Sequence, residues 1–296
     1  MDQFQDGQHV WLRSRVRGKY LSARGDGEGV RLREGRASLK AAWAVHRHVG
    51  IDGVEYVLLH SAAYGRYLAA TDDRAPLLLC GYRVVLQNYD RDPMEAIRWQ
   101  AVKPPGAAED DVLLRQVRRG HRYLRANGKI QRWIRGVSVD DPQNITTMMH
   151  WVVEPIPAMQ GRPALPPPTA RDRHPGDLSV WLGFSPASIR TIRYVRADDD
   201  GDYPELEEVW YALHFTGRSV HRLRGLLRDE LARDDHVAPA DLIMCVRAGR
   251  HGRLTPLVVN LPHHGDSFQI VLIMDGTPGA QTASRILSCI PPCLQP

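Results

Sequence analysis

The stretch GKYLSA at Gly18–Ala23 recurs twice in the first half of the chain, as GRYLAA at Gly65–Ala70 and as GHRYLRA at Gly120–Ala126. Each copy follows a short run in which apolar residues alternate with their neighbours: HVWLRS, YVLLHS and DVLLRQ. Two alternating runs joined by a short turn that contains glycine predict a β-hairpin. The chain is therefore expected to form the same hairpin three times.

The three copies also end alike, at Trp43, Trp99 and Trp151, which are spaced 56 and 52 residues apart. Similar periods at both ends of the unit indicate true internal repetition. Further β-like runs lie between the two ends, so that each unit is predicted to contain four strands. One such unit cannot bury its apolar face alone, whereas three can close around a shared axis without an open edge. The sequence therefore predicts a mainly β protein that begins with a β-trefoil.

The residues that repeat are predicted to be scaffold and not ligand contacts. Equivalent apolar positions in a closed repeat structure face its common core. The predicted core positions are Tyr20, Leu21, Ala23, Tyr67, Leu68, Ala70, Tyr123, Leu124 and Ala126, together with the three tryptophans.

The character of the chain changes after the third unit. AMQGRPALPPPTARDRHPGDL is rich in proline and arginine and has no periodicity, so we expect a linker over residues 158–187. Two strands, an amphipathic helix with Ser219 as its N-cap, and further strands follow. This order over residues 188–275 is that of a smaller α+β, ubiquitin-like β-grasp domain. We expect residues 1–157 to form the trefoil and residues 276–296 to be a disordered tail.

The positive charge of the chain belongs to its first half. The formal net charge is +5, and residues 1–160 carry 24 Lys and Arg against 18 Asp and Glu. Residues 161–296 carry 15 basic and 16 acidic residues. A basic surface favours acidic partners, without choosing among proteins, nucleic acids and lipids.

The basic residues gather at two of the three hairpins. The first reads RSRVRGK and the third RQVRRGHR, whereas the second, HSAAYGR, has only Arg66. If the repeats are related by rotation, this difference predicts an asymmetric binding site for an acidic partner. The candidate partner-binding residues are Arg13, Arg15, Arg17, Lys19, Arg115, Arg118, Arg119 and Arg122.

No motif for catalysis, for a cofactor or for a metal is found. A P-loop, a dinucleotide fingerprint, a nucleophile elbow and a kinase signature are all missing from the sequence. An acidic stretch resembles a calcium loop, but Arg196 stands at the position of its first carboxylate ligand. Cys80 lies in an apolar run and is expected to be buried and inert. We therefore expect a protein that is not an enzyme and that has no cofactor.

The targeting signals are equally few. The first ten residues have no basic or apolar segment typical of a signal peptide, and no apolar run is long enough to span a membrane. Four cysteines do not make a disulfide framework in a chain of this length, which favours free thiols in a reducing compartment. We expect a cytoplasmic protein that is not secreted, with the nucleus as an alternative.

Three segments resemble a known family. HVWLRSRVRGKYLSA, RYLRANG and LIMCVRAG are similar to motifs of the plant domain-of-unknown-function 569 family, and the resemblance covers roughly residues 1–155 and 188–274. The first domain of that family looks like the fascin-type β-trefoil of actin cross-linking proteins. The resemblance thus implies the fold that the repeats predict, and contact with actin filaments. Fascins join several trefoils, whereas this chain has one, so that bundling would need a dimer or both domains.

Three functional hypotheses follow. The first is a non-catalytic binding or scaffold protein whose basic trefoil surface contacts an acidic protein such as filamentous actin. The second is a trefoil module that binds a carbohydrate or another ligand. The third, which is less favoured, is nucleic-acid binding through arginine, with Trp133 or Tyr82 stacking on bases.

Overall fold

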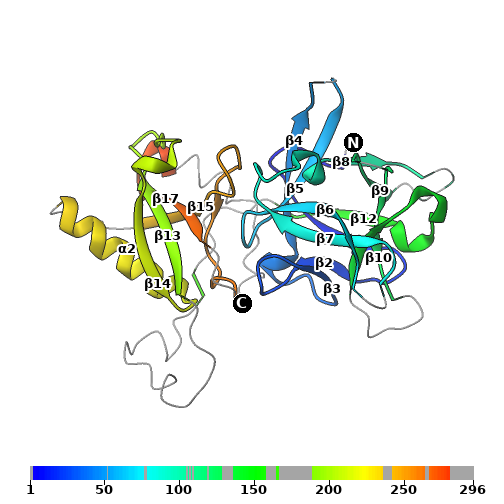
Figure 1. The fold of residues 1–296 in the computed structure, drawn as a ribbon, viewed down its shortest axis with the longest axis horizontal. Coiled ribbons are helices and arrows are strands. Elements are labelled where there is room, and N and C mark those ends of the chain that lie inside the picture. The colour runs from blue at the N-terminus through cyan, green and yellow to red at the C-terminus, as the bar shows by residue number, and fades with distance from the viewer. Residues whose placement is uncertain are drawn as a thin grey trace, which may run out of the picture.

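The structure is a computed structural model with two domains, which lie side by side in Figure 1 with the trefoil on the right. It describes residues 3–51, 53–76, 79–104, 106, 108, 110–118, 120–128, 136–157, 165–166, 189–235, 242–263 and 267–280. No helix within these ranges is both long and apolar enough to cross a membrane.

Twelve strands build the first domain, four from each repeat. They are β1 (His9–Ser14), β2 (Tyr20–Ala23), β3 (Val30–Arg33), β4 (Ala42–Val49), β5 (Glu55–Ser61), β6 (Tyr67–Arg74), β7 (Tyr82–Gln87), β8 (Trp99–Val102), β9 (Asp111–Gln116), β10 (Tyr123–Ala126), β11 (Val137–Asp140) and β12 (Trp151–Pro155). Short 3-10 helices lie at Leu39–Ala41 (η1), Met94–Ile97 (η2), Pro142–Asn144 (η3) and Thr147–Met149 (η4).

The first and last strands of the repeats form a closed barrel. β1 pairs with β12 and β4, β5 pairs with β4 and β8, and β9 pairs with β8 and β12, which completes the ring. The other six strands form three hairpins, β2–β3, β6–β7 and β10–β11. Pairing of β11 with β7 and a bridge between Gly29 and Val85 join these hairpins to one another. The predicted β-trefoil of three four-strand repeats is confirmed.

The three tryptophans hold equivalent places in the core. Each is fully buried, and its indole N–H donates to the carbonyl of the repeated leucine in the same unit. These bonds join Trp43 to Leu21, Trp99 to Leu68 and Trp151 to Leu124, at 3.0, 2.8 and 3.0 Å. The repeated tryptophans, leucines and alanines therefore lie in the common core, as predicted, whereas Tyr67 and Tyr123 pack in separate clusters and Tyr20 is only partly buried.

The second domain is a five-stranded sheet with one helix. Its elements are β13 (Ile189–Arg196), η5 (Glu207–Val209), β14 (Tyr211–Thr216), α2 (Val220–Asp235), β15 (Leu242–Val246), β16 (Thr255–Pro256) and β17 (Phe268–Met274), with the strand order β14-β13-β17-β15-β16. β13 and β17 are parallel, as in the β-grasp. Ser219 caps α2, since its hydroxyl accepts from the backbone N–H of Arg222 at 3.2 Å. The predicted smaller α+β domain is confirmed.

Three local features differ from the expectations. LTPLVVNLP is predicted as a strand, but only Thr255–Pro256 is one, and the loop that follows lies against the trefoil. Ordered structure extends past the expected boundary to Ala280, which is buried. Leu165 of the linker packs against the cores of both domains. The rest of the linker, apart from Pro166, and the tail with Cys289 and Cys293 lie outside the described residues.

The prediction that Cys80 is buried is wrong. Its side chain is exposed, and its backbone N–H donates to Asn127 Oδ1 at 3.4 Å. Leu79 and Cys80 precede β7, which begins at Tyr82, and do not belong to the strand. Apolar composition alone therefore did not distinguish a strand from the loop that leads into it.

Candidate binding site at the domain junction

The predicted basic residues of the first hairpin are all engaged by other residues of the trefoil. Their partners are Glu154 for Arg13 at 2.5 Å, Asp110 and Asp111 for Arg15, the carbonyl of Gly128 for Arg17, and Glu34 for Lys19 at 3.3 Å. The Arg15 bonds lower the pKa of Asp111 even though burial opposes that shift. These side chains tie the first hairpin to the third repeat.

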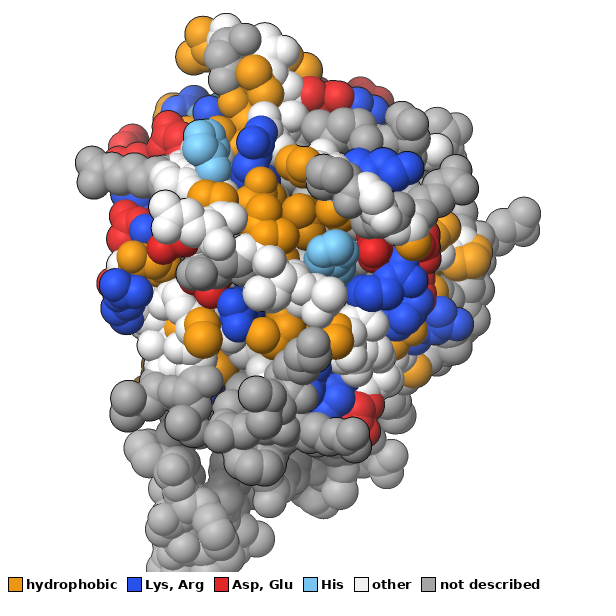
Figure 2. Space-filling model, turned by 90° about the vertical axis from the view of Figure 1, so that its right-hand side faces the viewer, with side chains coloured by type: hydrophobic (Ala, Val, Ile, Leu, Met, Phe, Trp, Pro, Cys, Tyr) orange, Lys and Arg blue, Asp and Glu red, His pale blue; other side chains and the backbone are white. Residues whose placement is uncertain are grey.

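The third hairpin is tied to its neighbours in the same way. Arg115 donates to Gln100, Arg118 and Arg122 pair with Asp72 at 3.0 and 3.2 Å, and Arg122 lies 3.4 Å from the centroid of the Tyr82 ring. Arg119 lies outside the described residues. Figure 2 looks onto the trefoil from the side away from the second domain, and its basic side chains are scattered among acidic and apolar ones. The described basic residues of the two hairpins are therefore engaged within the trefoil, by carboxylates or, for Arg17 and Arg115, by uncharged oxygens.

The second hairpin carries few cations because the ubiquitin-like domain covers it. Ala62, Ala63 and Tyr64 at its turn are buried, and they belong to the same core cluster as Val258 and Val259 of the second domain. Burying unpaired charges here would cost several kcal/mol each. The difference among the three hairpins thus marks where the domains dock.

Gly65, in the turn of this hairpin, is required by the docking. Its φ is +68°, and a Cβ built on it would lie 3.2 Å from the Cβ of Thr255. A larger residue would therefore be strained in its backbone and also crowd the other domain.

Buried neutral groups replace charged ones under the second domain. Three residues hold equivalent positions, each directly after the leucine of the strand that opens its repeat: Arg13, His60 and Arg115. His60 is the one that is fully buried, and its Nδ1 lies 3.2 Å from Thr255 Oγ1. Burial holds the pKa of His60 well below its usual value, so that the ring is neutral at pH 7. A neutral imidazole can be buried here at far lower cost than a guanidinium.

A neutral histidine also stands in place of a charged residue at a second set of equivalent positions. Glu154 and His46 each lie three residues after the tryptophan of their repeat. Where Glu154 pairs with Arg13, His46 instead has its Nδ1 3.2 Å from the hydroxyl of Tyr67. Burial, followed by the charge of Arg253, lowers the pKa of His46 to about 4. The docked junction is therefore built from uncharged rings, which the sequence analysis had not singled out.

Direct bonds between the domains fix their orientation. The Tyr67 hydroxyl accepts from the backbone N–H of Arg253 at 3.1 Å, and the guanidinium of Arg253 pairs with Asp6 at 2.9 Å. Other cross-domain contacts join Tyr89 N–H to the carbonyl of Ala248 at 2.8 Å, His263 N–H to the carbonyl of Gly25 at 3.0 Å, and His251 to Asp90 at 2.8 Å. Bonds spread over this many segments hold the two domains in one arrangement.

A polar cleft of about 490 Å³ opens beside this junction. Its trefoil wall comes from the first and second repeats, and its other wall comes from two loops of the ubiquitin-like domain. The polar side chains that line it are Glu28, Arg66, Gln87, Asn88, Asp90, Arg91, Arg250, Ser267 and Gln269. Amides, carboxylates, a hydroxyl and guanidinium groups therefore converge on one space that neither domain encloses alone.

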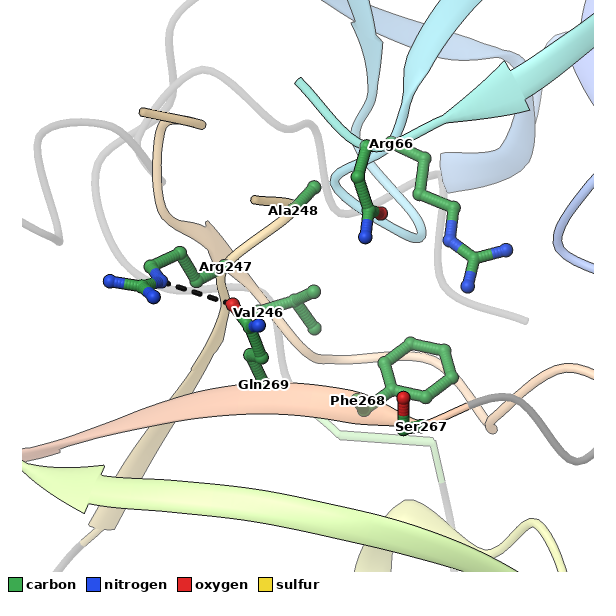
Figure 3. A pocket seen from close by; sticks show the side chains of 8 residues that line it. Arg66, Val246, Arg247, Ala248, Ser267, Phe268 and Gln269 are labelled. Carbon is green, nitrogen blue, oxygen red and sulfur yellow. Dashed lines mark hydrogen bonds between the residues drawn. The ribbon is translucent and has the colours of Figure 1, made fainter. Parts of the chain in front are cut away.

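Figure 3 shows a smaller pocket that shares Arg66, Asn88, Ser267 and Gln269 with this cleft, and there Arg66 reaches from the trefoil toward β17. Its guanidinium carbon lies 5.6 Å from the centroid of the Phe268 ring, and one N–H donates to the carbonyl of Gly27 at 3.1 Å. On the facing wall, Arg247 Nε donates to Gln269 Oε1 at 3.1 Å. Both polar groups are thus oriented before any ligand enters, which lowers the entropy cost of binding.

A carboxylate–imidazole pair lies at the rim of the cleft. Asp90 and His251 form a pair at its rim, but no hydroxyl or thiol of the described residues bonds to that imidazole. No group of three or more His, Cys, Asp and Glu side chains in the described ranges is arranged to hold a metal ion. The arrangement can donate to and accept from a polar ligand on several sides.

Sequence reasoning missed these cleft residues because they come from five segments of the chain. One signal could have led to them, namely the second hairpin, which repeats the scaffold letters but lacks the basic residues. Patterns within each repeat cannot reveal which surface a second domain covers, since that depends on packing between distant segments.

Two family models match the chain. One, described as a β-trefoil domain of unknown function (DUF569), matches residues 1–154. The other, described as the DUF569-associated ubiquitin-like domain, matches residues 188–273. No curated protein sequence matches the chain significantly.

The similar solved structures described here each cover about half of this chain. The designed three-fold symmetric protein ThreeFoil is 17% identical, with a TM-score of 0.40 over 50% of this chain and 99% of its own. A ricin B-like lectin of Macrolepiota procera in complex with lactose is 15% identical, with a TM-score of 0.40 over 51% and 96%. The SDF2-like protein of Arabidopsis thaliana is 13% identical, with a TM-score of 0.41 over 51% and 93%.

Proposed function

Because the chain belongs to the family with a DUF569 β-trefoil and its associated ubiquitin-like domain, we propose a function for the two domains together. We infer that the protein is a non-catalytic binding protein whose ligand enters the cleft between them. The observation that carries this proposal is the cleft of about 490 Å³, lined by polar side chains of both domains. That volume lies in the usual range of small-molecule sites.

The lining favours a ligand rich in hydroxyl groups, of which carbohydrates are the main class. Each hydroxyl both donates and accepts, which suits a wall that alternates amides such as Asn88 with carboxylates such as Glu28 and cations such as Arg66. The charges of the wall are partly satisfied already, since Arg250 pairs with Glu205 at 3.0 Å and Asp90 pairs with His251. A strongly charged ligand therefore fits this wall less well than a neutral one.

Binding to an array of glycans and soluble saccharides tests the proposal, with each hit measured by calorimetry. Ser267→Trp fills the cleft and is expected to abolish the binding of any hit. Gln143→Trp places the same side chain on exposed surface in η3, outside the cleft, and is expected to leave binding unchanged. A blank array, or equal loss in both variants, would rule out the cleft as a saccharide site.

Binding of filamentous actin or another acidic protein by the hairpin arginines stays a prediction. The ion pairs described above do not favour it, because an acidic partner would have to displace carboxylates such as Asp72 and Asp111. Co-sedimentation with filamentous actin over a salt series tests it directly. Pelleting at low salt that fades as salt rises would support it, and no pelleting at any salt would count against it.

A further inference from the structure

A second feature of the junction is a half-buried lysine at the seam between the domains. Lys40 lies in η1, and its Nζ is 6.0 Å from the centroid of the buried Tyr64 ring. A Cβ built on Gly25 would lie 3.8 Å from this Nζ and 3.2 Å from the ring of His263. The ammonium group of Lys40 therefore lies where the trefoil contacts the loop that follows β16.

The positive charges of three arginines act on Lys40. Arg31 and Arg33 project from β3 of the trefoil, and Arg218 precedes α2 of the ubiquitin-like domain. Desolvation, then the positive charges of these three arginines, lowers the pKa of Lys40. Arg218 is held in place because its Nε donates to the carbonyl of Leu261 at 2.8 Å. Both domains thus contribute cations to one cluster.

The cluster lacks compensating negative charge, unlike the hairpin arginines. None of its four cations forms an ion pair with a residue that the structure describes. The carboxylate that opposes them is Asp26, which already pairs with Arg24 at 3.1 Å and accepts the backbone N–H groups of the turn. Like charges gathered in a partly desolvated seam repel one another, so this arrangement is more favourable with an anion bound.

A buried hydroxyl at the same place has no partner. Tyr64 is fully buried, and its hydroxyl makes no hydrogen bond within the described residues. Burial raises its pKa to about 12, and the charges of Arg218, Asp26 and Arg31 also act on it, which places it among the same groups. A buried hydroxyl without a hydrogen-bond partner destabilises the folded protein. The missing element is an acceptor of hydrogen bonds that carries negative charge.

We propose that this seam binds a phosphate group through Lys40, Arg31, Arg33 and Arg218, with the Tyr64 hydroxyl donating to one of its oxygens. A phosphate group offers up to two negative charges and three acceptor oxygens, which suits several convergent cations better than a carboxylate does. The site is distinct from the polar cleft, although the loop Arg24–Gly29 contributes to both, with Glu28 in the cleft and Gly25 beside Lys40. The phosphate group is that of a soluble phosphate or of a lipid headgroup, which share this chemistry.

Calorimetry of the full chain with pyrophosphate tests the soluble source, and flotation with phosphatidylcholine vesicles, with and without phosphatidylinositol phosphate, tests the lipid source. We expect wild type to bind in at least one arm and Lys40→Gln to bind at least tenfold more weakly. The control Arg233→Gln also removes one positive charge, but from an ion pair with Glu230 in α2, and is expected to bind like wild type.

Tyr64→Phe separates recognition from folding, because it keeps the ring and removes only the unpaired hydroxyl. It is expected to bind phosphate several-fold more weakly while its melting temperature is equal to or above that of wild type. No binding in either arm, or equal affinity of wild type and Lys40→Gln, would overturn the proposal. Neither result depends on the saccharide experiment, so the two proposals fail separately.

Discussion

Shortening two valines at the junction should release the ubiquitin-like domain from the trefoil without unfolding either one. Val258 and Val259 are 9% and 8% exposed and belong to the trefoil core cluster, although they follow β16 of the second domain. The variant Val258→Ala/Val259→Ala removes four methyl groups. At about 0.8 kcal/mol for each group, plus the cavity left behind, docking should weaken by roughly 3 to 5 kcal/mol. The population of the undocked form should therefore rise by more than about a hundredfold.

Hydrogen exchange at three backbone amides reports this change. The N–H groups of Tyr89, Arg253 and His263 each donate across the junction, and their exchange should quicken in the variant. Amides within the barrel and within β17 should keep the wild-type rates, since the two folds remain intact.

A matched control is Leu257→Ala, one residue earlier. Leu257 is buried in the core of the ubiquitin-like domain, so this variant should quicken exchange throughout β15 and β17 instead. If the three junction amides of the double variant exchange at wild-type rates, then the two valines do not hold the domains together, and the docking argument is refuted.

Three further predictions concern stability. Burial lowers the pKa of His9 to about 4, so this ring stays neutral when folded while the unfolded chain protonates below its usual pKa of 6.5. Stability should fall by about 2 kcal/mol from pH 7.5 to pH 5, and an unchanged urea midpoint would contradict this. Trp99→Phe leaves the buried Leu68 carbonyl without its hydrogen-bond donor and should lower the free energy of unfolding, measured by urea denaturation, by roughly 1 to 3 kcal/mol. Trp43→Phe should lower it by a similar amount, whereas a substitution at the surface should not. Arg118→Glu places a second negative charge beside Asp72 and should lower the free energy of unfolding by about 1 kcal/mol. An unchanged melting temperature would indicate that the pair of Arg118 with Asp72 does not form in solution.

Much of the trefoil could be predicted because its signals are local and occur three times. Alternation in HVWLRS, YVLLHS and DVLLRQ specifies strands, and the glycine in each turn allows a tight hairpin. Three copies then require a closed arrangement, because a single unit leaves its apolar face and its edges exposed. The helix of the second domain was equally predictable from its apolar spacing and from Ser219.

The candidate sites could not be predicted in the same way. Arg15 and Lys40 look alike as basic residues in the sequence, yet Arg15 is neutralised by Asp110 and Asp111 while Lys40 faces three other cations. Which cation finds a carboxylate depends on strands that pair across about a hundred residues of chain. The cleft residues share no motif for the same reason.

The amino-acid sequence by itself determined the threefold trefoil, the tryptophan core and the separate β-grasp domain, because periodicity and turn residues act over short distances. The sequence also showed that the second hairpin lacks most of the basic residues of the other two. Only the tertiary structure decided what this difference means, since His60 lies buried against Thr255 of the second domain and Tyr64 belongs to the same core cluster as Val258 and Val259. The physical reason is desolvation, because a charged side chain is stable at the surface but costly where another segment covers it. Here the covering segment lies some 190 residues away in the chain.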